Sequence, residues 1–255
     1  MRTLFLLFGI LLFTFSCTAV RAESPALTPD SSVDDVLDAL RDRGQDLKDF
    51  VAKVRLTATD ETSGDSTTRI GQLVYQKKAD ENARIRITFT QLKQGDRITA
   101  KKQEYLLDKG HFIDRDYQKQ LEVNRQVTRP GQKLDLFKLG EGPFPLPLGQ
   151  DKAEVHKAFE VTKAAPAKND PANSVHLVLT PKPDTKLARK FKTIDVWVDL
   201  KTHMPVRIAT IDTQETTENT TDLDVTSVNG GVKDEEFTLP EVDNSWNRHD
   251  EPYAE

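Results

Sequence analysis

The stretch Arg84-Ile85-Arg86-Ile87-Thr88-Phe89-Thr90 alternates apolar and polar side chains without a break. Neighbouring residues of a β-strand point to opposite faces, so Ile85, Ile87 and Phe89 share one face and both arginines share the other. The pattern therefore predicts a strand with one buried face and one face, carrying the arginines, in solvent.

The same period of two continues through most of the chain, between turn signals such as Gln94-Gly95-Asp96 and Asp108-Lys109-Gly110. Short connections favour antiparallel neighbours, and the absence of predicted crossover helices disfavours a parallel sheet. Asn229-Gly230 predicts a hairpin between the last two strands. The predicted strands are 50–57, 68–76, 83–90, 98–107, 111–117, 120–127, 159–163, 174–180, 192–200, 205–213, 220–228 and 236–239.

Helical period comes before the first strand, with Val36, Leu37 and Leu40 on one face and Ser31 or Ser32 as the N-cap; Gly44 should weaken the helix end. In mid-chain, residues 140–149 contain three prolines and resemble a lid or plug, and 153–159 allow at most two helical turns. The predicted fold is mainly β with one N-terminal helix and short plug helices. We expect one domain over 31–245, built as an unclosed antiparallel β-barrel, and a tail over 246–255.

The N-terminus has the pattern of a targeting signal. Twelve almost uniformly apolar residues, Leu4 to Phe15, are too few for a membrane span, and Val20-Arg21-Ala22 supplies the small residues of a cleavage site. We expect a signal peptide over 1–22, export to the periplasm, and a flexible lead-in over 23–30. The alternative is a lipoprotein signal, in which Cys17 is acylated and anchors the chain.

The composition and the motif content argue against several classes of function. The chain has 255 residues, 36% of them hydrophobic, and a formal net charge of −5, so it should fold and nucleic acid is disfavoured as a partner. The single cysteine excludes a disulfide framework and a cysteine-based zinc site. Five histidines stand at no ligand spacing, and the usual catalytic signatures are absent. We expect no cofactor, no metal and no enzymatic activity, although a catalyst assembled only by the fold, such as an exported hydrolase, stays open.

An open barrel of about eleven or twelve strands has more interior than its side chains easily fill, so a cavity is expected. Its apolar lining favours a lipid tail, because an acyl chain releases about 0.8 kcal/mol per buried CH2. In the proline-rich segment, Phe144, Leu146 and Leu148 should cover the mouth. The predicted lining is Phe50, Val54, Leu56, Leu73, Tyr75, Ile85, Ile87, Phe89, Leu107, Leu121, Val123, Leu177, Leu179, Val196, Val198 and Ile208.

A series of short motifs follows the predicted first helix in a characteristic order. They are Gly71-Gln72-Leu73-Val74-Tyr75-Gln76-Lys77, Asp108-Lys109-Gly110-His111-Phe112, Ile194-Asp195-Val196-Trp197-Val198-Asp199, Met204-Pro205-Val206-Arg207-Ile208 and Phe237-Thr238-Leu239-Pro240. In this order the motifs resemble the LolA family, periplasmic carriers of outer-membrane lipoproteins, and its wider lipoprotein-sorting family.

The resemblance implies an unclosed barrel with plugging helices and a monomeric, non-enzymatic carrier. Its cavity would take acyl chains of lipoproteins, or another lipid, from an inner-membrane exporter and pass them to an outer-membrane receptor. The family's basic residue associated with lid opening falls on Lys77, where lysine replaces the usual arginine. The alternative from the same resemblance is an envelope sensor or interaction module that uses the barrel to bind a regulatory protein.

Overall fold

The computed structural model describes residues 26–77, 83–129, 132, 136–137 and 148–253. The predicted signal peptide with Cys17, and Phe144 and Leu146 of the predicted lid, lie outside the described residues.

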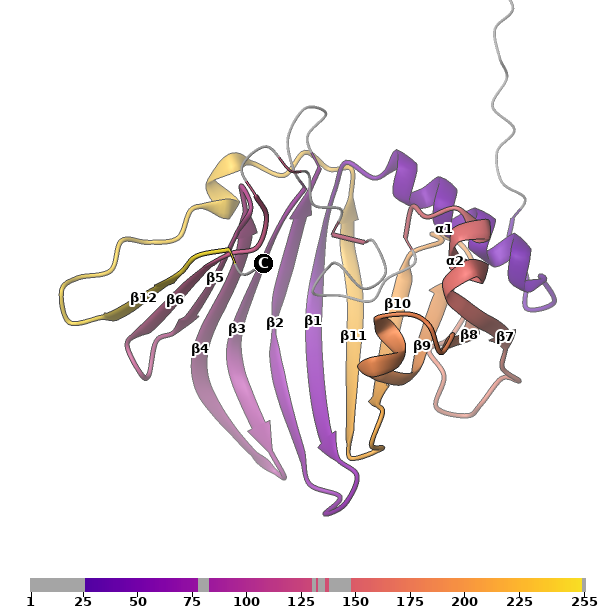
Figure 1. Cartoon of the computed structure of the whole chain (residues 1–255), viewed down its shortest axis with the longest axis horizontal. Coiled ribbons are helices and arrows are strands. Elements are labelled where there is room, and N and C mark those ends of the chain that lie inside the picture. The colour runs from indigo at the N-terminus through magenta and orange to yellow at the C-terminus, as the bar shows by residue number, and fades with distance from the viewer. Residues whose placement is uncertain (1–25, 78–82, 130–131, 133–135, 138–147, 254–255) are drawn as a thin grey trace, which may run out of the picture.

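The described strands form one strongly curved sheet of twelve (Figure 1), in the order β12-β6-β5-β4-β3-β2-β1-β11-β10-β9-β8-β7. The outermost strands, β12 and β7, do not pair with each other, so the sheet is open. All neighbours are antiparallel except β12 and β6, which are parallel. The predicted fold class, an unclosed antiparallel barrel, is therefore confirmed. The strands are β1 (Asp49–Asp60), β2 (Ser66–Gln76), β3 (Arg84–Gln94), β4 (Arg97–Asp108), β5 (His111–Asp116), β6 (Leu121–Gln126), β7 (Phe159–Lys163), β8 (Ser174–Pro181), β9 (Phe191–Asp199), β10 (Pro205–Asp212), β11 (Thr217–Val228) and β12 (Asn247–Glu251).

Two helices plug one part of the sheet. α1 (Val33–Asp46) begins at Ser32, which forms a reciprocal capping box with Asp35. α2 (Lys152–Ala158) lies beside α1 at the β7–β11 end (Figure 1), and Lys152 Nζ is 2.8 Å from a carboxylate oxygen of Asp38. The apolar faces of both helices belong to one hydrophobic cluster with the side chains on one face of the sheet, which we call the inner face.

α1 continues beyond Gly44, where the sequence suggested a weak end. A Cβ at Gly44 would overlap the backbone nitrogen of Gly149, whose N–H donates to the carbonyl oxygen of Leu40. The glycine is therefore used for close backbone packing between α1 and residues 148–149.

Part of the outer face of the sheet is shielded from solvent, contrary to the prediction that Arg84 and Arg86 lie in solvent. Arg84 is only 7% exposed, because its guanidinium lies 4.1 Å from the ring centre of Phe237 and pairs with Asp234. Arg86 lies 2.5 Å from the fully buried carboxylate of Glu104. The C-terminal segment crosses this face and buries what local alternation had assigned to solvent.

Two predictions for the C-terminal part were wrong. Residues 236–239 form no strand: a 3-10 helix, η2 (Asp234–Phe237), stands there, so Asn229-Gly230 does not close a hairpin. Asn229 adopts a positive φ of 54° and its side chain accepts from the backbone N–H of Lys48, which directs the chain away from β11. Part of the predicted tail forms the exposed strand β12. The remaining 3-10 helix is η1 (Leu187–Arg189).

Candidate apolar binding pocket

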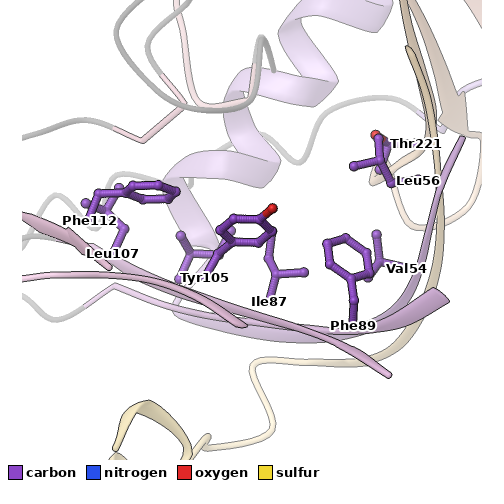
Figure 2. Close-up of a pocket in the computed structure, with 9 residues that line it drawn as sticks. Val54, Leu56, Ile87, Phe89, Tyr105, Leu107, Phe112 and Thr221 are labelled. Carbon is purple, nitrogen blue, oxygen red and sulfur yellow. The ribbon is translucent and has the colours of Figure 1, made fainter. Parts of the chain in front are cut away.

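A pocket of about 180 Å³ opens on the inner face. Figure 2 shows its side chains rising from β3, β4 and β5, with Leu56 and Thr221 at the curved end. The lining is Val54, Leu56, Ile85, Ile87, Phe89, Tyr105, Leu107, Phe112 and Thr221.

Aromatic rings make a rigid wall on one side. Tyr105 lies between its neighbours, edge-on to Phe89 at a ring-centre distance of 6.1 Å and stacked on Phe112 at 5.8 Å. Such arrangements stabilise the rings beyond the effect of their burial. The ring contacts therefore favour the wall in the form described.

A glycine helps to keep the space beside this wall open. Gly71 of β2 is paired with Val54 on one side and Phe89 on the other, and both of these residues line the pocket. A Cβ at Gly71 would overlap the carbonyl oxygen of Thr88 and lie 2.7 Å from the Cα of Phe89. The inner face thus lacks a side chain at a central position, because β2 and β3 approach too closely to accommodate one.

Polar groups lie within and beside the apolar lining. Burial raises the pKa of the Tyr105 hydroxyl, and the negative charge of Asp114 acts in the same direction. Burial also raises the pKa of the Asp114 carboxyl, which accepts a long hydrogen bond of 3.4 Å from Gln103. The arrangement offers an apolar volume with a hydroxyl and ionisable groups beside it, and contains no nucleophile paired with a base.

The predicted lining residues fall into three groups. Val54, Leu56, Ile85, Ile87, Phe89 and Leu107 line the pocket. Phe50, Leu73, Tyr75, Leu177, Leu179, Val196, Val198 and Ile208 are buried in the same hydrophobic cluster but do not line the pocket. Leu121 and Val123 are half-exposed on β6, outside the pocket.

The sequence interpretation missed Tyr105, Phe112 and Thr221. Continuing the alternation from Leu107 back to Tyr105, and across the hairpin to Phe112, would have found the two aromatic residues, since Leu107 and Phe112 are register partners. Thr221 had no such signal, because a threonine in an alternating strand is as common on the solvent face as on the buried face.

The structure describes two of the predicted lid residues, Lys77 and Leu148, and places them in different surroundings. Lys77 is exposed at the end of β2, and its backbone N–H donates to the carbonyl oxygen of Lys48. Leu148 is 2% exposed and packs in the core. Neither residue lines the pocket.

Within the part of the chain that the structure describes, no three metal-binding side chains come close enough together to hold an ion. None of the described helices has the length and apolarity needed to cross a membrane.

No model of a known protein family matches the chain, and no curated protein matches it in sequence. Solved structures of similar fold include an uncharacterized conserved protein from Thermus thermophilus, at 10% identity and a TM-score of 0.49 over 86% of this chain and all of that one. The MucA/MucB complex of Pseudomonas aeruginosa contains a chain 12% identical, with a TM-score of 0.44 over 81% of this chain and 60% of that one. A LolA superfamily protein from Nitrosomonas europaea is 14% identical, with a TM-score of 0.33 over 82% of this chain and 98% of that one. These likenesses are distant and concern the fold alone.

Proposed function

We propose that this protein is a non-enzymatic binder of acyl chains in the bacterial periplasm, which carries lipoproteins or another lipid with the chain end in the inner-face pocket. The observation that supports the proposal is the lining: eight of the nine residues around the pocket carry an aliphatic or aromatic side chain. Water in such a space makes few hydrogen bonds, whereas a hydrocarbon chain loses nothing by entering it.

The volume sets the size of the occupant. A space of about 180 Å³ corresponds to roughly six methylene groups, if each takes about the 30 Å³ share of one liquid water. Burying six methylenes contributes about 5 kcal/mol before the costs of association. The pocket as described therefore suits the end of one acyl chain, and a complete lipid needs further contacts.

The lid part of the hypothesis remains a proposal. Residues 140–149 would cover the chain, and Lys77 would take the place of the family's basic residue in lid opening. Leu148 is buried among core side chains next to α1. It would anchor the end of such a lid and would not contact the cargo.

The first experiment asks what the protein holds. The purified protein is extracted with organic solvent, the extract is analysed by mass spectrometry, and the delipidated protein is titrated with a fluorescent fatty-acid probe in competition with dodecanoate. We expect reproducible co-purified lipid and saturable probe binding displaced by dodecanoate. Absence of both would contradict the proposal.

A different surface supports the alternative function, an envelope module that binds a regulatory protein. A groove of about 380 Å³ on the outer face is lined by apolar and polar groups, among them Val74, Arg86 and Glu236. If a stoichiometric protein complex forms, if substitutions in this groove abolish it, and if no lipid co-purifies, the alternative replaces the carrier proposal.

A further inference from the structure

An arginine lies on the inner face next to the apolar pocket. Arg69 of β2 is paired across the sheet with Leu56, which lines the pocket, and stands two residues from Gly71, between Val54 and Phe89. Residues two apart on a strand share a face and are about 7 Å apart. The guanidinium therefore belongs to the same surface as the apolar lining, just beyond its central gap.

The charge of Arg69 is poorly compensated. Its Nε atom is buried without a hydrogen-bond partner, and no described carboxylate lies within ion-pair distance of its guanidinium. On the outer face, Arg84 and Arg86 each pair with a carboxylate, although the Nε atom of Arg86 also lacks a hydrogen-bond partner; Arg69 differs in having no such ion pair with a described residue. A buried donor without an acceptor costs free energy. A ligand group that accepts a hydrogen bond from Arg69 would therefore remove this cost.

Two other polar groups lie near Arg69. Arg69 is within electrostatic range of the Tyr105 hydroxyl and of Asp114. Figure 2 shows the Tyr105 oxygen at the outer end of its ring, away from the strand. The hydroxyl can donate to an anion that approaches Arg69, whereas an ionised Asp114 would oppose it.

We propose that Arg69 binds the oxyanion of an anionic amphiphile, a carboxylate or a phosphate, whose hydrocarbon chain occupies the pocket. This inference rests on the acyl-chain binding proposed above and adds the orientation and charge of the ligand. The guanidinium offers a planar fork of N–H donors that matches either oxyanion. The apolar lining takes the chain, and Arg69 selects amphiphiles that carry a negative head.

The test compares three ligands of equal chain length: dodecanoate, dodecyl phosphate and uncharged dodecanol. The binding of each is measured by displacement of a neutral fluorescent probe from the wild-type protein, Arg69→Gln and Arg69→Lys. The matched control is Arg55→Gln, because Arg55 is an exposed arginine on the neighbouring strand, one register position away and on the opposite face.

We expect Arg69→Gln to weaken dodecanoate, dodecyl phosphate or both by about 10- to 100-fold, and dodecanol by less than about threefold. The more strongly affected anion identifies the head group as carboxylate or phosphate. Arg69→Lys should keep part of the affinity, Arg55→Gln should keep all of it, and Asp114→Asn should tighten the anions. Circular dichroism and thermal unfolding confirm that each variant is folded at the assay temperature.

The outcomes separate this inference from the function on which it rests. If the wild-type protein binds none of the three ligands, the acyl-chain proposal itself fails. If the wild-type protein binds dodecanol and both anions, but folded Arg69→Gln binds all three unchanged or weakens them equally, the pocket stands and the assignment of Arg69 is overturned.

Discussion

Filling the pocket is the most direct test of whether its empty volume matters. Leu56 lies on β1 at the curved end of the pocket, is half-buried, and is paired with Thr221. The substitution Leu56→Trp adds an indole on this inner-face position. Because one side of Leu56 borders the pocket and not another side chain, the larger ring has space to enter without displacing the core.

The expected loss follows from the volume. If the indole takes about half of the pocket, about three of the roughly six methylene positions are lost to the ligand. At about 0.8 kcal/mol per methylene this is about 2.4 kcal/mol, or about a 50-fold increase in Kd for dodecanoate. The free energy of unfolding should stay within about 1 kcal/mol of the wild-type value, since filling a void preserves apolar contacts.

The assay is displacement of the fluorescent probe, together with urea unfolding. The matched control is Ile98→Trp, which adds the same bulk at an aliphatic residue that is 56% exposed on β4. This control should leave Kd unchanged. The reasoning is refuted if Leu56→Trp is folded and binds dodecanoate as tightly as the wild-type protein, because the ligand would then lie elsewhere.

Three further predictions concern stability. Gly71→Ala should lower the free energy of unfolding by about 1–3 kcal/mol because the added methyl overlaps the backbone of β3. Gly230→Ala should cost less, because the added methyl would meet only the side chain of Ser227, which can move; urea midpoints distinguish the two variants. Burial alone would raise the pKa of Glu104, but hydrogen bonds from the Tyr117 hydroxyl and from the Arg86 guanidinium outweigh it and lower the pKa below the ordinary 4.5. In the wild-type protein, the ionised Glu104 should therefore stabilise the fold above about pH 4.5, and this contribution should be lost as the pH falls through the lower folded-state pKa. The free energy of unfolding of Glu104→Gln should depend less on pH in acid than that of the wild-type protein. The exposed control Glu160→Gln should show the same pH dependence as the wild-type protein. Leu148→Asp should destabilise the protein by about 3–5 kcal/mol in thermal or urea unfolding, because it buries a charge in the core; a wild-type midpoint would show instead that this residue belongs to a separable lid.

The alternation of side chains was sufficient to predict β1 to β11, because burial of one face is a local requirement that repeats every two residues. It worked for Ile85, Ile87 and Phe89, whose side chains are all buried on the inner face. The N-cap, predicted at Ser31 or Ser32 and observed at Ser32, was equally local, since the side-chain hydrogen bonds of Ser32 reach only to Asp35. These features could be read from the chain alone.

The same pattern failed where a distant segment decides the environment. Arg84 follows the alternation, yet it is buried because Phe237 and Asp234, about 150 residues later, cover the outer face. The C-terminal strand β12 had no sequence signal, because its five side chains are exposed and its pairing with β6 is made by the backbone.

The sequence by itself therefore determined where β1 to β11 lie, which face of these strands is apolar, and that one helix precedes the sheet. Only the tertiary structure decided which apolar side chains meet other side chains and which border empty space. Leu177 and Ile87 have the same local pattern and belong to the same hydrophobic cluster, but only Ile87 lines the pocket. The physical reason is that a void depends on what lies across the interior, and that is set by residues far away in the chain.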